Sequence, residues 1–282
     1  MKILVTDRDT LTVQLIRSKL EAMGHTVIEE PVKNNAIERL GKESFDIVFF
    51  DPAPLNHARP IVLGIRRSVK NYPYIVMISK EPGKEDLLKS GVNDALIKPL
   101  DTQVLEGVAA NAERLTALVR RIGDESEDFR SAGGVIAKSA LNQLFLAALD
   151  RADRYGERSY FVFISIRNYA EILSMDGPYA AEYATAKLSQ YLVRLRRQSD
   201  VLAQTGKNEY CLMLQRPIYA TEPAEAANRF ADALGRLEDI CASDNTKVEV
   251  AVTLLELPSG ASPVEHVLTF DKSKKSAVDA QI

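Results

Sequence analysis

The chain has 282 residues, which is enough to bury two separate hydrophobic cores. Its composition, 46% apolar and 27% charged residues with a formal net charge of −3, is typical of a soluble globular protein and gives no basic face for nucleic acid. No apolar run is long enough to cross a membrane, and MKILVT begins a strand, so a cytoplasmic protein without a membrane span is expected. Cys211 and Cys241 are expected to be buried thiols, because with three histidines they form no metal-ligand pattern.

The first 122 residues alternate short apolar runs with amphipathic stretches. The predicted strands are 3–6, 26–29, 46–50, 74–78 and 95–97, and the predicted helices are 10–23, 34–41, 58–69, 83–90 and 101–122. This regular alternation predicts a doubly wound α/β domain with a five-stranded parallel sheet of the flavodoxin-like type. Runs such as IVFF, apolar throughout, suit strands that are buried on both faces.

A polar, acidic stretch at 123–134 interrupts this pattern and is predicted to be a linker between domain 1–122 and domain 135–282. The second half has a different order of elements. Helices are predicted at 137–155, 168–175, 179–198, 222–239 and 262–276, with strands at 159–166, 200–204, 210–214 and 247–256. The hairpin in this order predicts an α/β domain with a mixed, antiparallel-rich sheet.

Residues 2–122 resemble a response-regulator receiver domain. The likeness rests on Asp7, Asp51, Ser79 and Lys98 at the ends of the first, third, fourth and fifth strands, and on the stretch DALIKPLD, whose Lys–Pro bond is typically cis in that family. These strand ends converge at one edge of a doubly wound sheet. The resemblance implies that Asp51 is the phosphoacceptor, that Ser79 and Lys98 contact the phosphoryl oxygens, and that Asp7 and Asp51 hold Mg²⁺.

Two positions depart from the receiver pattern. Arg8 stands where the family has a second acid, and a cation there competes with Mg²⁺ and can pair with Asp51. Asp9 follows, but strand alternation points it elsewhere. Ala95 replaces the aromatic residue that couples phosphorylation to output in the family. The alternative to phosphorylation is therefore a receiver fold that serves only for dimerisation or docking.

The second predicted domain resembles a GGDEF (diguanylate cyclase) domain, with GKNEY in place of the signature. Diguanylate cyclases need carboxylates to hold two metal ions. By this resemblance Ser165 and Asn208 replace the metal-binding acids, and Lys207 replaces the second glycine. Leu173 and Glu182 replace the two residues that recognise guanine. The chain is therefore expected to be no enzyme but a degenerate GGDEF protein.

The resemblance extends to the RxxD product-inhibition motif of the family, here Arg197 and Asp200, which ends six positions before Gly206. An arginine fork can bond guanine O6 and N7 together, and a carboxylate can accept from N1 and N2. Arg151 and Arg229 match the family's auxiliary arginines and are assigned to the same cyclic di-GMP site. The alternative is that Arg197 simply complements a helix C-terminus.

Two functions follow from these expectations. The first is a non-catalytic cyclic di-GMP effector of a two-component phosphorelay, modulated through its receiver domain. Its expected partners are cyclic di-GMP, an unidentified signalling protein, a histidine kinase and a second copy of the chain in a homodimer. The second is a nucleotide-independent scaffold or dimerisation module. Mg²⁺ in the receiver domain is the other expected cofactor, and an active cyclase would need carboxylates that the chain lacks.

Overall fold

The computed structural model describes residues 1–54, 57–69, 71–80, 89–129, 133–237, 239–243 and 245–271. The chain forms two compact units, each of which is described by itself. The first comprises Met1–Asp124 with two later stretches, Phe145–Arg158 and Leu257–Ala261. The second comprises the remaining described residues. The predicted domain limits, 1–122 and 135–282 with a linker at 123–134, divide the chain by sequence order alone and stay a prediction.

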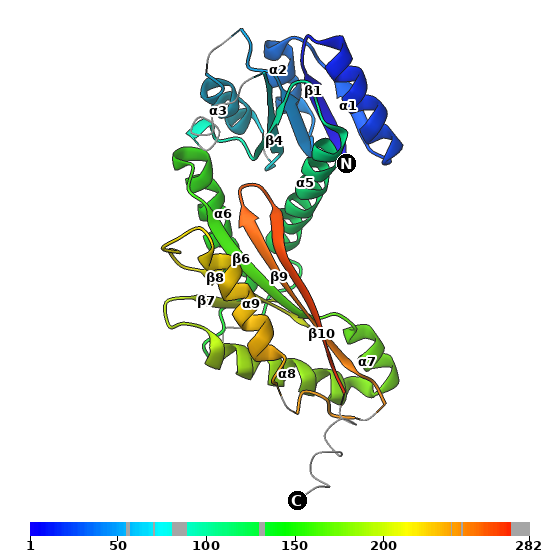
Figure 1. Cartoon of the computed structure of the whole chain (residues 1–282), viewed down its shortest axis with the longest axis vertical. Coiled ribbons are helices and arrows are strands. Elements are labelled where there is room, and N and C mark those ends of the chain that lie inside the picture. The colour runs from blue at the N-terminus through cyan, green and yellow to red at the C-terminus, as the bar shows by residue number, and fades with distance from the viewer. Residues whose placement is uncertain are drawn as a thin grey trace, which may run out of the picture. The chain divides into compact units, whose positions relative to one another are not determined.

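The sheet of the first unit is parallel and has the strand order β2-β1-β3-β4-β5. Its strands are β1 (Lys2–Thr6), β2 (Thr26–Glu29), β3 (Ile47–Phe50), β4 (Tyr74–Ser79) and β5 (Asp94–Ile97). All four residues of β3 are buried, as expected for a central strand covered on both faces. This arrangement confirms the predicted doubly wound, flavodoxin-like fold (Figure 1).

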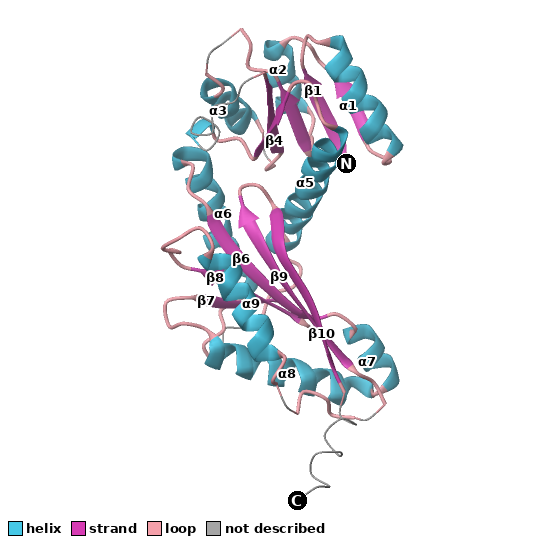
Figure 2. Ribbon diagram, viewed as in Figure 1, coloured by secondary structure: helices cyan, strands magenta, loops and turns pink. Residues whose placement is uncertain are grey.

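Helices pack on both sides of this sheet (Figure 2). They are α1 (Thr10–Ala22), α2 (Lys33–Lys42), α3 (Arg59–Ser68) and α5 (Thr102–Gly123). Helix α1 contacts α5, and α2 contacts α3, so each pair covers one face. Asp9 and Asp101 cap α1 and α5 by accepting backbone N–H groups of the first turn. The helix predicted at 83–90 lies outside the described residues except for its last two, which are helical.

The second unit is built on a five-stranded sheet with the order β10-β9-β6-β8-β7. The strands are β6 (Ser159–Ile166), β7 (Val201–Gly206), β8 (Glu209–Leu214), β9 (Val248–Leu257) and β10 (Ala261–Phe270). The helices wholly within this unit are α7 (Tyr169–Met175), α8 (Gly177–Leu195) and α9 (Glu222–Leu234), whereas α6 (Lys138–Tyr155) begins here and belongs to the first unit from Phe145 onward. Strand β8 pairs antiparallel with both β6 and β7, which confirms the predicted hairpin and α/β class. One apolar cluster joins residues of α8, α9 and the sheet. No helix in the described part of the chain is long and apolar enough to span a membrane.

The helix predicted at 262–276 is wrong. Residues 261–270 form strand β10, and residues 272–282 lie outside the described part of the chain. Burial along β10 alternates, with Val264, His266, Leu268 and Phe270 less exposed than their neighbours. This is the period of two that a half-buried strand requires, and β10 extends the sheet beside β9.

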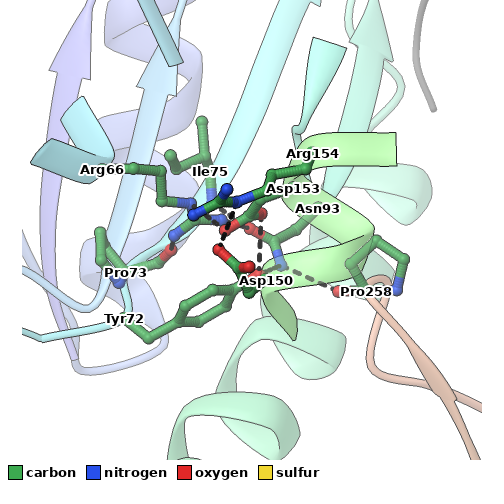
Figure 3. Close-up of polar contacts among 9 residues, drawn as sticks. All are labelled: Arg66, Tyr72, Pro73, Ile75, Asn93, Asp150, Asp153, Arg154 and Pro258. Atoms are coloured by element: carbon green, nitrogen blue, oxygen red, sulfur yellow. Dashed lines mark hydrogen bonds and ion pairs between the residues drawn. The ribbon is translucent and has the colours of Figure 1, made fainter. Parts of the chain in front are cut away.

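The later stretches of the first unit are held by a buried polar cluster, which we call the Arg66 cluster: Arg66, Tyr72, Asn93 and Asp153 (Figure 3). The Arg66 guanidinium lies 3.1 Å from Asp153 Oδ2, donates to Asn93 Oδ1 at 2.8 Å and stacks 3.9 Å from the centre of the Tyr72 ring. Asn93 also donates to the Pro258 carbonyl at 2.9 Å. The cluster therefore ties α6 and the turn after β9 to the amino-terminal ends of β4 and β5.

Two glycines permit the close packing of these stretches. A Cβ at Gly91 would lie 2.8 Å from the Asp153 carbonyl oxygen, and one at Gly260 would lie 2.6 Å from the Asn111 carbonyl oxygen. Both have positive φ, +81° and +69°, which L side chains rarely adopt. Neither position accommodates a larger residue without displacing the backbone opposite.

Candidate functional site

The first candidate site lies at the carboxyl edge of the parallel sheet. Asp7 directly follows β1, Asp51 follows β3 and Lys98 follows β5, and the parallel order brings the three together as predicted. Lys98 Nζ lies 2.8 Å from Asp7 Oδ2 and 2.7 Å from Asp51 Oδ2. Burial acts to lower the pKa of Lys98, but hydrogen bonds to Asp51 and Asp7 together with their negative charges outweigh it, so the pKa of Lys98 is raised. One ammonium thus serves both acids.

The remaining carboxylate oxygens at this edge are also engaged. Asp51 Oδ1 accepts the Ala53 N–H at 2.7 Å, and Asp7 Oδ1 accepts the Asp9 N–H at 2.9 Å. Asp9 itself caps α1 and accepts the Thr12 hydroxyl at 2.7 Å, which lowers the pKa of Asp9. The side chain of Asp9 is therefore committed to the helix and supplies no third acid to the site.

Magnesium does not fit these residues. Mg²⁺ takes oxygen ligands in octahedral geometry, and carboxylates supply its charge compensation. Here Asp7 and Asp51 share Lys98, and the cavity beside them, about 230 Å³, is also lined by Arg8 and Lys33. No cluster of three potential metal-ligating residues occurs in the described part of the chain. The donor set therefore opposes the expected Mg²⁺ site.

The other receiver positions lie where the resemblance puts them. Ser79 is the last residue of β4, and its carbonyl accepts the Lys98 N–H at 2.9 Å. The Lys98–Pro99 peptide is cis. Ala95 is half-buried in β5. The roles of Asp51 as phosphoacceptor and of Ser79 and Lys98 as phosphoryl contacts stay predictions.

The second candidate site is the β7–β8 hairpin of the second unit, which the resemblance matches to the GGDEF signature. Ser165 of β6 pairs with Glu209 of β8, so the two positions are adjacent in the sheet. Glu209 Oε1 accepts the Thr205 hydroxyl at 2.6 Å, and Asn208 donates its amide to the Ile166 carbonyl at 2.7 Å. The Asn208 side chain therefore connects the turn between β7 and β8 to strand β6. Of the positions that the resemblance assigns to metal binding, neither carries a carboxylate.

The positions matched to phosphate and guanine binding lie on the surface. Lys207 is exposed and lies 3.6 Å from Glu127. Leu173 on α7 is 42% exposed, and Glu182 on α8 is exposed. A leucine cannot hydrogen-bond a base edge. Guanine recognition by the usual residues is therefore absent from these positions.

The third candidate site surrounds the RxxD motif. Arg197, Asp200 and Arg229 line one small cavity beside the start of α9, so the structure brings these three predicted residues together. Asp200 is only 5% exposed, and its Oδ1 accepts the Gln215 N–H at 3.2 Å. The cavity measures about 10 Å³, room for roughly one water molecule. The site is closed in this conformation.

Glu222, which sequence analysis missed, closes this site. Its Oε1 lies 2.6 Å from Arg197 Nη1, and its Oε2 accepts the Ile218 N–H at 2.6 Å. Both bonds lower the pKa of Glu222, and the backbone hydrogen bond from Ile218 has the larger effect. An acid in the first turn of a helix is ordinary, and only the tertiary structure shows it opposite Arg197. The only sequence feature that pointed to Glu222 was its position directly after Thr221, at the start of a predicted helix.

Arg151, the fourth predicted residue, belongs to the first unit rather than the second. It lies on α6, where its Nε is 3.3 Å from Glu157 Oε1. It is not among the residues that line the cavity of Arg197 and Asp200. Within the second unit, the site therefore consists of Arg197, Asp200 and Arg229 with Glu222.

No protein-family model and no curated protein matches the chain. Among solved structures, a two-component response regulator from Clostridium difficile is 23% identical, with 44% of this chain and 99% of that chain covered and a TM-score of 0.36. A response regulator from Thermotoga maritima is 24% identical, covering 39% and 94%, with a TM-score of 0.36. The receiver domain of a sensor histidine kinase from Pseudomonas aeruginosa PAO1, which has a magnesium ion in its active-site cleft, is 20% identical, covering 41% and 97%, with a TM-score of 0.36. The receiver fold of the first unit rests on its own strand order and on the positions of Asp7, Asp51 and Lys98.

Proposed function

We propose that the chain is a non-catalytic signalling effector that binds cyclic di-GMP at Arg197 and Asp200. The observation that carries the proposal is the gathering of Arg197, Asp200 and Arg229 around one cavity. By the GGDEF resemblance, Ser165 on β6 and Asn208 in the neighbouring hairpin stand where a cyclase needs metal-binding acids, so binding without turnover is the expected activity. The receiver half would then modulate binding or its readout.

The residue chemistry suits one guanine. The planar guanidinium of Arg197 can donate two parallel hydrogen bonds to O6 and N7, and the Asp200 carboxylate can accept from N1 and N2. Arg229 adds a charge for a phosphate. Adenine presents a donor where guanine has O6, so the pair of Arg197 and Asp200 also accounts for discrimination between the two bases.

Replacing Arg197 with alanine tests this function. Calorimetric titration of cyclic di-GMP into the full chain should give a Kd in the micromolar range or below, and Arg197→Ala should weaken binding by at least about 30-fold, because charge-assisted bidentate bonds are lost. Arg194, exposed in the last turn of α8, provides the matched control. Absence of binding to the folded wild-type chain, or equal loss in Arg194→Ala, would rule the proposal out. GTP with Mg²⁺ should give no turnover.

Glu222 must release Arg197 before a guanine can enter. Replacing it with glutamine retains an acceptor for Ile218 but removes the charge that holds the guanidinium and repels the ligand phosphates. The Glu222→Gln variant should therefore bind cyclic di-GMP about 10-fold more tightly than wild type. Glu225 lies on the same helix as Glu222 and accepts hydrogen bonds from the Tyr219 and Thr221 hydroxyls. The control variant Glu225→Gln should therefore leave the affinity for cyclic di-GMP unchanged. Weaker binding by Glu222→Gln would assign Glu222 to the ligand site instead.

The second candidate function is a nucleotide-independent scaffold or homodimerisation module. It is favoured by the ion pair of Arg197 with Glu222, which accounts for the arginine without any ligand. Its partners would be a histidine kinase and a further signalling protein, as the resemblance of residues 2–122 to a receiver domain implies. A scaffold predicts that cyclic di-GMP releases no heat and that Arg197→Ala keeps every partner interaction.

A further inference from the structure

The cavity at the carboxyl edge of the parallel sheet carries more positive than negative charge. It is lined by Asp7, Asp51, Arg8 and Lys33, and Lys98 lies against both of the acids. Three cations face two carboxylates, so the site has a net charge of about one positive unit. A divalent cation is repelled from such a site, whereas a small anion is attracted.

The two acids are both ion-paired within the protein. Lys98 bridges them, and their other oxygens accept backbone N–H groups at 2.7 Å and 2.9 Å. Arg8 and Lys33 are therefore the cations in excess. Arg8 is exposed, so its guanidinium can reorient toward a ligand in the cavity.

Lys33 is held in place by the loop after β3. Its Nζ donates to the Pro52 carbonyl at 2.7 Å and to the Ala53 carbonyl. Burial lowers the pKa of Lys33, while Asp51 opposes that effect and Arg8 adds to it. Lys33, Asp51 and Arg8 line the same cavity, so their charges act on the same space. The position of Lys33 beside Asp51 is thus set before any ligand arrives.

The size of the cavity defines the class of ligand. A volume of about 230 Å³ holds several water molecules and admits a tetrahedral oxyanion, but it is small for a nucleotide. Guanidinium groups bind such oxyanions through two parallel N–H donors, and an ammonium adds a third. We propose that this cavity binds a phosphate-class oxyanion without a divalent metal, held by Arg8 and Lys33.

Titration of inorganic phosphate into the full chain in the presence of EDTA tests the proposal. Backbone NMR shifts at Asp9 and Ala53 should saturate with a Kd in the millimolar range or below. Arg8→Gln and Lys33→Gln should each weaken binding about 5- to 10-fold, because each removes one charge-assisted contact. Lys19→Gln, which removes a lysine from the last turn of α1, is the charge-matched control and should bind as wild type does.

Added Mg²⁺ should leave the phosphate affinity unchanged. Binding that appears only with Mg²⁺, or that Arg8→Gln does not weaken, overturns the proposal. Because Arg8 is exposed, its replacement should leave the fold intact, which circular dichroism verifies.

The same chemistry would serve free phosphate or a phosphoryl group on Asp51. Acetyl phosphate with EDTA separates the two sources by intact mass. A covalent product requires a bond from Asp51 oxygen to phosphorus, cleavage of the phosphorus–oxygen bond to the acetyl group and departure of acetate. An unchanged mass together with saturable phosphate binding identifies the free ion, and a gain of one phosphoryl group identifies the attached one.

Discussion

Replacing Arg66 with alanine is expected to lower the free energy of unfolding by about 3–5 kcal/mol. The Arg66 and Asp153 side chains are only 11% and 14% exposed, so removing the arginine leaves a buried carboxylate without its cation. Asn93 and the Pro73 carbonyl lose donors at the same time, and the Tyr72 ring loses its stacking partner. Burial raises the pKa of Tyr72 to about 12, so that phenol stays neutral at neutral pH and supplies no charge to replace the lost cation. Urea denaturation followed by far-ultraviolet circular dichroism measures the loss.

Arg67 provides the control for this change. It follows Arg66 in α3 and is exposed, so Arg67→Ala should alter the free energy of unfolding by less than about 0.5 kcal/mol. Equal effects of the two substitutions would show that the Arg66 cluster does not hold the first unit together.

The contribution of Asp153 to the free energy of unfolding should depend on pH. Burial raises the pKa of Asp153 despite the nearby Arg66, so the folded chain binds this proton more tightly than the unfolded chain does. The contribution of Asp153 to stability is therefore full below its unfolded pKa and falls as pH rises through the higher folded value. Relative to Asp153→Asn, which does not titrate, the wild type should gain stability as pH is lowered from 6 to about 4. A constant difference over this range would contradict the prediction.

Replacing Arg8 with aspartate is expected to create a Mg²⁺ site, which we expect the wild-type chain to lack. The substitution changes the charge at the cavity of Asp7, Asp51 and Lys33 by two units and supplies a third carboxylate for octahedral coordination. Two unit charges acting on a divalent ion should tighten its binding at least about 100-fold. Calorimetric titration with MgCl₂ should show a saturable site in Arg8→Asp and none in wild type.

Arg8→Gln separates charge from coordination. It removes the cation without adding a ligand, so its affinity for Mg²⁺ should lie between those of wild type and Arg8→Asp. Comparable Mg²⁺ binding in wild type and Arg8→Asp would mean that Lys98 yields the two acids to the metal, which contradicts the reading of this edge as an anion site.

The doubly wound fold and the residues at its edge were predictable from sequence. Each strand of the first unit is a short apolar run bounded by polar residues, Gly or Pro. The alternation of these strands with amphipathic helices allows few arrangements other than a parallel sheet. In that topology the residues after the strands meet at one edge, so Asp7, Asp51 and Lys98 could be grouped before any distance was known. The register of Arg197 and Asp200 against the hairpin was equally local, because both residues lie in the short turn between α8 and β7.

Strand β10 was missed because its local sequence is compatible with both the helical and the strand periodicity. Burial alternates along 261–270, but the sequence itself does not, because Val267 and Leu268 are consecutive and His266 is polar, so the segment also suits a surface helix. Pairing beside β9 buries Val264 and satisfies one edge of its backbone, and that gain depends on a strand already in place. Secondary structure at a sheet edge is therefore decided by the partner strand.

The contacts that decide the chemistry of each site join residues distant in sequence. Glu222 meets Arg197 across 25 positions, Lys98 meets Asp51 across 47, and Tyr72 meets Asp153 across 81. Periodicity records which face of an element is apolar, but it holds no information on which polar side chain lies opposite another. Packing brings these pairs together, and burial then makes an unpaired member costly enough for the pairing to be kept. Sequence therefore indicates which residues can act at each edge, and the tertiary structure decides which of them are already neutralised.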